Sequence, residues 1–285
     1  MSHQTDLFIG EADRPGRLGQ AEISYGDASS ILTPASGFMA GYDYTLNPYA
    51  GCAFGCSYCY AAFFTRDKEL QDRWGRWVKV KQNAITLLKK VRPGTLTGKW
   101  VYMSSVTDPY QPIEKVLELT RDLLRELAGR DQPKLVIQTR SPLVTRDVDL
   151  LRQFSLVQVN ITVTTDSEDV RKAFEPLCPS NRQRLNAARE LVAAGIDTVV
   201  TMTPLLPVQD AEEFAAQLLA TGVRRFIVQP FHADGGRFVA GTRDEAMEIS
   251  GRLGWSNERY LQTLEVLKQT LPEVGVGKQG FAPRG

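Results

Sequence analysis

Three cysteines lie within eight residues of one another, at a spacing that suits the binding of one small inorganic centre. Cys52, Cys56 and Cys59 form a C-x3-C-x2-C pattern, and Gly51 and Gly55 allow the backbone to turn closely around a bound group. A [4Fe–4S] cube usually has four cysteine ligands, so three thiolates leave one iron open. An open coordination position is typical of a catalytic metal centre. The spacing therefore favours a catalytic iron–sulfur centre.

Two other readings of these cysteines stay open at this point. A structural zinc site needs four ligands, and the remaining candidates, Cys178, His3 and His232, are far away in the sequence. Ferredoxin loops use C-x2-C-x2-C-x3-C, which differs from the spacing here. The other reading is three structural cysteines without a metal. Four cysteines in the whole chain do not indicate a disulfide framework, and thiols in a reducing compartment indicate metal ligation or catalysis.

The composition is that of a globular protein with a large buried core. The chain has 285 residues, of which 42% are hydrophobic and 24% charged, which suits one large domain or two small ones and excludes wholesale disorder. A net charge of +1 gives no overall basic coat for nucleic acid. No apolar run approaches the roughly 20 residues of a membrane span, and the first ten residues lack the basic and apolar regions of a signal peptide. We therefore expect a cytoplasmic protein.

Short apolar runs alternate with helical patterns along the chain. The predicted strands, each rich in apolar and β-branched residues, cover 42–46, 100–104, 134–139, 156–164, 198–203 and 225–229. The predicted helices cover 77–91, 113–128, 181–194, 211–220 and 257–270. Ser180 and Gln183 have the spacing of a capping box at one helix start. This alternation predicts an α/β fold of parallel βαβ units, either a doubly wound open sheet or a partial barrel.

The cysteine loop and several other stretches resemble the radical S-adenosylmethionine (radical SAM) enzymes and, among these, the spore-photolyase-like branch. The loop follows the first predicted strand, and an aromatic residue, Tyr58, directly precedes the third cysteine. The matching stretches are NPYAGC at 47–52, CYA at 59–61, VTDPYQP at 106–112, TRS at 139–141, EP at 175–176 with RL at 184–185, and PLLP at 204–207.

The resemblance implies a partial (β/α)6 TIM-like barrel of the radical SAM type, with the chemistry at the C-terminal ends of the strands. It implies that Cys52, Cys56 and Cys59 hold a [4Fe–4S] cluster and that S-adenosylmethionine binds the open iron. Reductive cleavage then gives a 5′-deoxyadenosyl radical, which takes a hydrogen atom from an unidentified substrate. An external one-electron reductant, similar to flavodoxin or ferredoxin, is the implied partner. The chain then divides into a loosely ordered lead-in at 1–40, a radical SAM core domain at 41–235, and a C-terminal helix and tail packed on the core at 236–285.

The resemblance implies cofactor contacts for polar residues that follow the second and third predicted strands. Ser105, Thr107 and Asp108 are expected to bind the methionyl ammonium of S-adenosylmethionine, although Thr-Asp-Pro is also ordinary turn chemistry. Arg140 stands where the branch usually has lysine. Its guanidinium is expected to pair the methionyl carboxylate through two parallel hydrogen bonds. The alternative for Arg140 is a solvated surface arginine.

Other residues are weaker candidates. Asn160, Thr162 and Thr164 alternate along the fourth predicted strand and so share one face. We choose Thr162 as the cofactor contact, against the alternative that all three are polar filling of a barrel layer. Tyr58 is expected to contact the adenine through its backbone, and packing is its alternative role. His232 follows the sixth strand and either faces substrate or is structural.

Cys178 and a local basic stretch each have a structural interpretation and a functional one. Cys178 is expected to be a free buried thiol, and its functional alternatives are radical quenching and metal ligation. Basic residues with aromatic residues between them occur at 66–81. This pattern suits nucleic acid, and a solvated helix face is the commoner reading.

One departure from the branch bears on the substrate. Spore photolyases carry a cysteine hydrogen-atom donor two residues before the hydroxyl–Asp pair, and the corresponding residue here is Ser105. A serine O–H bond is too strong for that role, which argues against dimer repair. The tyrosines at 58 and 60 do match the photolyase pattern, so DNA or RNA lesion repair or base modification stays an alternative. A structural zinc or iron–sulfur protein is the alternative of another class.

Overall fold

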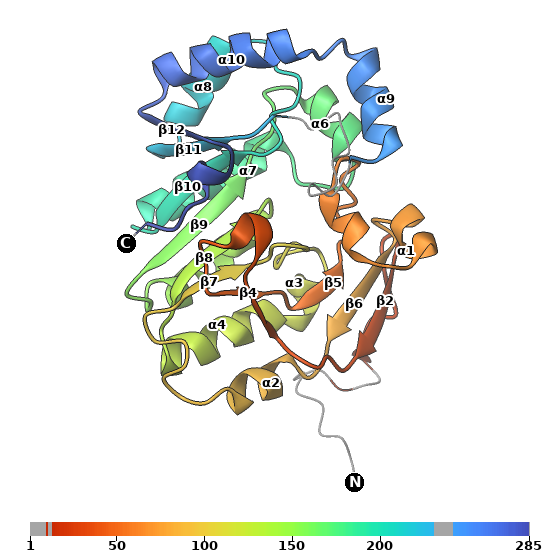
Figure 1. Cartoon of the computed structure of the whole chain (residues 1–285), viewed down its shortest axis with the longest axis vertical. Helices are drawn as coiled ribbons and strands as arrows, with labels where there is room; N and C mark the ends of the chain where they lie inside the picture. The colour runs from red at the N-terminus through yellow and green to blue at the C-terminus, as the bar shows by residue number, and fades with distance from the viewer. Residues whose placement is uncertain (1–9, 11–12, 231–241, 285) are drawn as a thin grey trace.

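A sheet of eight strands forms the centre of the fold (Figure 1). The computed structural model describes residues 10, 13–230 and 242–284. The strand order is β12-β11-β10-β9-β8-β7-β4-β3. Six of these strands were predicted from the sequence: β4 (Tyr44–Leu46), β7 (Trp100–Met103), β8 (Lys134–Thr139), β9 (Val157–Thr162), β10 (Asp197–Met202) and β11 (Arg225–Val228). They lie side by side in chain order and are parallel, which confirms the predicted βαβ units.

The two outer strands leave the barrel incomplete. β3 (Leu32–Pro34) pairs antiparallel with β4 at one end, and β12 (Glu273–Val276) pairs parallel with β11 at the other. No pairing joins β3 to β12 among the described residues. The sheet is therefore open, as in a partial barrel, and the C-terminal tail adds the strand β12 to it.

Helices cover the outer face of this sheet (Figure 1). Their bounds are α1 (Lys68–Asp72), α2 (Ala84–Lys90), α3 (Glu114–Leu117), α4 (Leu119–Arg130), α5 (Val148–Leu151), α6 (Glu168–Phe174), α7 (Asn181–Ala193), α8 (Ala211–Leu219), α9 (Asp244–Arg252), α10 (Asn257–Thr270) and α11 (Gly277–Gly280), with the 3-10 helices η2 (Gly37–Met39), η3 (Tyr60–Phe64) and η4 (Pro142–Asp147). The capping box of Ser180 and Gln183 is present at the start of α7. The helix predicted at 113–128 is broken at Glu118, which has a left-handed φ of 51°. No helix in the described ranges is long and apolar enough to cross a membrane.

A second, four-stranded sheet supports the cysteine loop. Its order is β1-β2-β6-β5, with β1 (Arg17–Leu18), β2 (Ala21–Gly26), β5 (Tyr49–Gly51) and β6 (Trp77–Lys81). The helix predicted at 77–91 is therefore wrong over its first residues. Val78 and Val80 are buried and Lys79 between them is exposed, which is the period of a strand. The lead-in at 1–40 is likewise not loose throughout, because it contains β1, β2 and β3.

Two glycines let the cysteine loop approach β6 and the turn before it. Gly51 ends β5 with a φ of +75°, and a Cβ there would lie 2.5 Å from the carbonyl oxygen of Trp77. Gly55 has a φ of +57°, and its Cβ would lie 2.9 Å from the Cα of Gly75. Because both neighbours are backbone atoms, a side chain at either glycine needs a shift of the main chain.

We therefore expect Gly55→Ala to lower the free energy of unfolding of the metal-free protein by more than about 1 kcal/mol. The matched control is Gly129→Ala in α4, where a Cβ meets nothing within 4 Å and φ is ordinary. That change should stabilise the helix by about 0.5–1 kcal/mol. Denaturant unfolding of the two variants measures the difference. Equal effects of the two substitutions would contradict the close approach at Gly55.

Candidate functional site

The three cysteines of the motif lie together on the loop between β5 and η3. Cys52 and Cys56 are buried and Cys59 is partly exposed. Burial, followed by the charge of Asp108, raises the pKa of Cys52. Burial, followed by the neighbouring Cys56, raises the pKa of Cys59 to about 12. Within the described ranges, no three His, Cys, Asp or Glu side chains converge on one point as the ligands of a single metal ion do. A four-iron cube instead takes its cysteines at separate irons.

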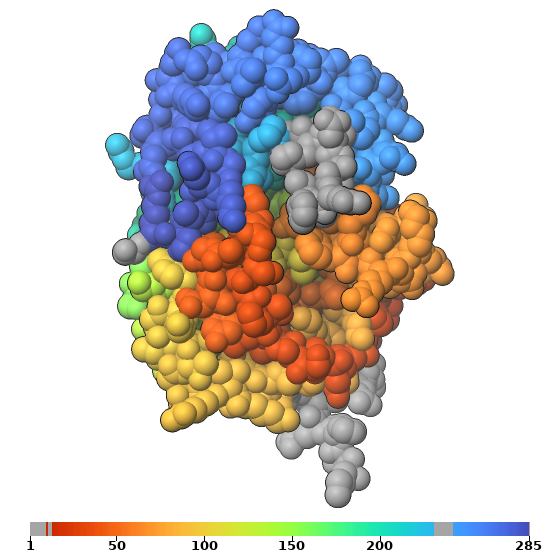
Figure 2. Space-filling model, in the orientation of Figure 1, coloured from red at the N-terminus to blue at the C-terminus, as the bar shows by residue number. Residues whose placement is uncertain are grey.

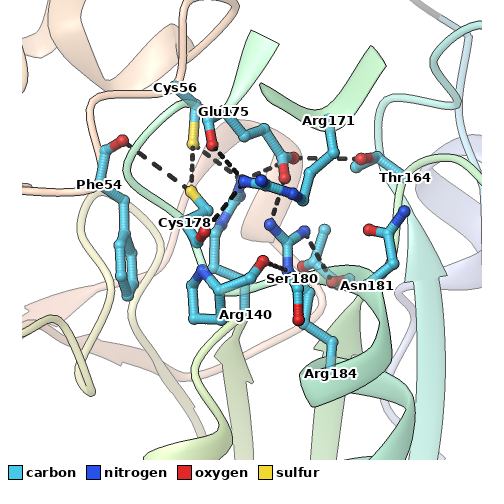
Figure 3. Close-up of polar contacts among 12 residues, drawn as sticks. Phe54, Cys56, Arg140, Thr164, Arg171, Glu175, Cys178, Ser180, Asn181 and Arg184 are labelled. Carbon is cyan, nitrogen blue, oxygen red and sulfur yellow. Dashed lines mark hydrogen bonds and ion pairs between the residues drawn. The ribbon is translucent and has the colours of Figure 1, made fainter. Parts of the chain in front are cut away.

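Cys56 differs from the other two thiols because its sulfur contacts two polar side chains (Figure 3). Its Sγ lies 3.6 Å from the Sγ of Cys178 and accepts a hydrogen bond of 2.9 Å from Nη1 of Arg140. The contact with Cys178 and then the charge of Arg140 lower the pKa of Cys56, against the effect of burial. The motif thiol with the most thiolate character is therefore the one beside the guanidinium.

Arg140 follows β8 and points at the cysteine loop. Its Nη1 also donates to Oη of Tyr58 at 2.8 Å and to Oε1 of Glu175 at 3.1 Å. Among the described residues, no hydrogen bond comes from its Nε or Nη2, so the donors on that edge of the guanidinium are without a protein acceptor there. The side chain is 17% exposed and paired. Arg140 is therefore not a solvated surface arginine.

A fully buried carboxylate, that of Glu175, holds Arg140 in place. Glu175 also accepts hydrogen bonds from Tyr58, from the fully buried Arg184, and from Oγ1 of Thr164 at 3.1 Å. Burial raises the pKa of Glu175, but Arg184 and Arg140 outweigh burial and lower the pKa to about 2. Two guanidiniums and one carboxylate therefore leave one positive charge in excess beside Cys56.

Arg171 and Arg184 fix the loop that carries Cys178 (Figure 3). Nη1 of Arg171 donates to the backbone oxygens of Glu175 and Cys178, both at 3.0 Å. Nε of Arg184 donates to the backbone oxygen of Pro179 at 2.9 Å. These bonds anchor the backbone on both sides of Cys178, which sets its sulfur against Cys56.

Asp108 follows β7 and ties the strand ends together. Its carboxylate accepts hydrogen bonds from the backbone nitrogens of Tyr110 and Arg140, both at 2.9 Å, and from Oγ1 of Thr139 at 2.6 Å. Burial raises its pKa although these donors lower it. The bond to Tyr110 is the turn chemistry expected of Thr-Asp-Pro. The bond to Arg140 connects this carboxylate to the guanidinium site.

The residues just before Asp108 pack against the cysteine loop. Oγ1 of Thr107 donates to the backbone oxygen of Gly51 at 2.6 Å. Oγ of Ser105 accepts a hydrogen bond from Nδ2 of Asn47 at 3.4 Å. Ser104 has a left-handed φ of 77°, and its buried Oγ has no hydrogen-bond partner among the described residues. The end of β7 is thus strained where it meets the site.

Thr162 lies in a polar layer on the sheet face opposite the helices. Its Oγ1 accepts from Nε2 of Gln138 at 2.6 Å and lies 3.1 Å from Oγ1 of Thr201. Asn160 is on the same face and accepts from Gln158 at 2.6 Å. Thr164 instead reaches Glu175. The structure therefore places Thr162 in a polar layer shared with Gln138 and Thr201 and Thr164 at the charged network.

The structure bears differently on His232 and on the basic stretch at 66–81. His232 lies outside the described residues. The basic stretch at 66–81 is divided between α1 and β6, and part of its charge is paired, with Lys68 on Asp72 at 2.6 Å and Arg73 on Glu22 at 2.8 Å. It is therefore not a single basic helix face.

Glu175 and Arg184 lie in stretches that match the branch, but no role was predicted for either residue. The helical pattern of α7 does indicate that Arg184 is buried. Arg184 lies on the same stripe of α7 as the buried Ala187, Ala188 and Leu191. A charged residue on an apolar stripe indicates a buried partner, since an unpaired buried charge is costly.

At neutral pH, Glu175→Gln should lower the free energy of unfolding of the metal-free protein by about 3–5 kcal/mol, because it leaves two buried guanidiniums without their carboxylate. The folded pKa of Glu175 is depressed to about 2 from 4.5. Its contribution is therefore complete above pH 4.5 and is lost as the pH falls toward 2. The stability difference between wild type and variant should shrink over that window.

Glu114→Gln is the matched control for this experiment. Glu114 is also fully buried and binds an arginine, Arg146, and a tyrosine, Tyr49. Burial outweighs these partners and raises its pKa, so its contribution is complete below pH 4.5 and is lost as the pH rises. Denaturant unfolding between pH 7 and pH 3 measures both variants. A Glu175→Gln difference that does not change with pH would contradict the assigned charge state.

The fold is similar to that of spore photoproduct lyase. The two structures superpose with a TM-score of 0.61 over 90% of this chain and 81% of the lyase, at 16% sequence identity. Structures of that lyase include complexes with dinucleoside spore photoproduct and with AdoMet. At this identity the likeness shows the fold, which confirms the expected partial barrel.

Relatives in sequence occur in archaea, a virus and bacteria. An uncharacterized protein of Methanocaldococcus jannaschii is 40% identical over 169 residues, which is 59% of this chain and 62% of that protein. One from Acidianus two-tailed virus is 29% identical over 78% of this chain and 76% of its own. One from Mycobacterium tuberculosis is 30% identical over 65% of this chain and 58% of its own. The match thus spans less than two thirds of the archaeal and mycobacterial proteins.

The family assignment comes from a family model. The model described as the Radical SAM superfamily matches residues 46–218, which hold the three cysteines of the motif and the network of Arg140 and Glu175. Membership implies an iron–sulfur cluster and S-adenosylmethionine as cofactors. The chain therefore belongs to the radical SAM superfamily and is an enzyme.

Proposed function

We propose that Cys52, Cys56 and Cys59 hold a [4Fe–4S] cluster with one open iron and that the protein cleaves S-adenosylmethionine reductively. When bound, the two cofactors supply the 5′-deoxyadenosyl radical that takes a hydrogen atom from substrate. The observation that carries this proposal is the position of three thiols on one loop, with the guanidinium of Arg140 2.9 Å from one of them. Thiolates are the donors that iron–sulfur clusters take, so the donor set fits the group.

Arg140 is the residue that binds the methionyl carboxylate. Its Nη1 is held by Glu175 and Tyr58, and its Nε and Nη2 form the edge that suits a bidentate carboxylate. Asp108 positions this group through the backbone nitrogen of Arg140. The excess positive charge of Arg140, Glu175 and Arg184 stabilises the anionic sulfur of Cys56 before any cofactor binds.

The remaining roles complete the proposal at the cofactor. Ser105, Thr107 and Asp108 bind the methionyl ammonium. Tyr58 contacts the adenine through its backbone, and Thr162 contacts the ribose or carboxylate.

Residues 41–235 form the core domain, flanked by the segments at 1–40 and 236–285. An external one-electron donor of the flavodoxin or ferredoxin kind supplies the electron, in the cytoplasm. The substrate stays unassigned.

The reconstituted, reduced protein should release 5′-deoxyadenosine from S-adenosylmethionine under anaerobic conditions. Cys52→Ala, Cys56→Ala and Cys59→Ala should each abolish this release, because each removes a cluster ligand. Cys178→Ala is the matched control, since it removes the remaining cysteine of the chain and should retain the release. Chromatography of the nucleoside and iron analysis of each variant measure these effects. A colourless, zinc-loaded wild type with no release would contradict the proposal.

Arg140→Gln should raise the KM for S-adenosylmethionine by about 10- to 100-fold, since a hydrogen bond to a charged group contributes about 1.5–3 kcal/mol. Arg140→Lys keeps the positive charge and should raise the KM less. Binding of S-adenosylmethionine to each variant, followed with iron content held equal, measures the effect. The carboxylate role is wrong if both variants bind S-adenosylmethionine as tightly as wild type.

A further inference from the structure

We infer that Cys56 and Cys178 form a reversible disulfide when the protein is free of metal and meets an oxidant. The two sulfurs are therefore a modification site that competes with cluster assembly. The consequence for iron loading rests on the proposed function, in which Cys56 is a ligand. The disulfide itself rests only on the arrangement of the two side chains.

The two thiols are already in contact. Their Sγ atoms are 3.6 Å apart, and all four cysteines of the chain are free thiols. A disulfide bond is about 2.05 Å long, so the sulfurs need to approach each other by about 1.5 Å. Among the residues that the structure describes, the Cys178 sulfur has one further hydrogen-bond contact, with the backbone oxygen of Phe54 at 3.9 Å. The geometry therefore selects Cys56 as its partner.

Both the reactivity and the access of this pair have a structural basis. The guanidinium of Arg140 lies 2.9 Å from the Cys56 sulfur, and cationic surroundings are those in which cysteines react. Cys178 lines an open cavity of about 580 Å³ together with Phe54, Leu177 and Pro179. A small oxidant in this cavity meets Cys178 first, and the Cys56 sulfur with which it reacts lies 3.6 Å from the Cys178 sulfur.

Hydrogen peroxide is the two-electron oxidant in this reaction. The Cys56 thiolate attacks the O–O bond, which gives a sulfenic acid and releases hydroxide. The Cys178 sulfur then attacks the sulfenic sulfur, loses its proton and displaces the hydroxyl group, so that the disulfide forms. In sum, two thiols and one peroxide give one disulfide and two waters. A thiol reductant reverses the step by exchange, so Cys56 is protected from irreversible oxidation.

The test uses the full chain, stripped of metal with a chelator and treated with one equivalent of hydrogen peroxide. Peptide mapping without reduction should find Cys56 linked to Cys178. Iron uptake by the oxidised protein should fall by at least about tenfold relative to the reduced protein, since a metal site needs its deprotonated ligands. Dithiothreitol should restore uptake in full.

Two substitutions keep the test specific. In Cys178→Ser treated with at least two equivalents of peroxide, Cys56 should pass through the sulfenic to the sulfinic acid, and dithiothreitol should no longer restore iron uptake. In Cys59→Ser, the link between Cys56 and Cys178 should form as in wild type. The inference is overturned if no link forms, if Cys52 and Cys59 are the linked pair, or if Cys178→Ser recovers like wild type. A correct link in a chain that never binds iron, even when reduced, supports the disulfide and refutes the proposed function.

Discussion

The site depends on the burial of one carboxylate between two guanidiniums. Glu175 is fully removed from water, and Arg184 is removed with it. Such a group is tolerated only where its hydrogen bonds are complete, and here they come from Arg184, Arg140, Tyr58 and Thr164. The hydrogen bonds that satisfy this carboxylate connect the end of β8, the loop before α7 and the cysteine loop. Residues that are far apart in the sequence therefore take fixed positions around Cys56.

The parallel sheet makes this convergence possible. Neighbouring parallel strands end at one edge, so the residues that follow β7 and β8 meet there. Asp108 and Arg140 are the example, because the carboxylate of one accepts the backbone nitrogen of the other. The small sheet that contains β5 and β6 brings the cysteine loop to the same edge. Close backbone contact at Gly55 fixes the loop without any side chain.

Much of this architecture could be predicted from the sequence. Continuous apolar runs such as 134–139 indicate strands buried on both faces. All six predicted strands are present. The error at 77–81 arose because apolar residues spaced for a helix stripe also fit the alternation of a strand. The strands of the lead-in and of the tail were not predicted because they depend on pairing with distant partners, which short-range patterns do not contain.

The candidate site was predictable in part. The cysteine spacing identified the loop, and the resemblance identified Arg140 as a residue near it. The contact of Arg140 with Cys56 and the approach of Cys178 were not predictable, because both depend on side chains from different loops. Thr162 was chosen for its face of β9, and that face holds a polar layer of its own.

The central claim is that three cysteines hold a cluster whose cofactor is anchored by Arg140. A crystal structure of the anaerobically reconstituted protein with S-adenosylmethionine tests it most directly. The account predicts a four-iron cube on Cys52, Cys56 and Cys59, with the methionyl carboxylate on Nε and Nη2 of Arg140. A cube ligated by Cys178, or a carboxylate bound elsewhere while Arg140 keeps only its present partners, would contradict it.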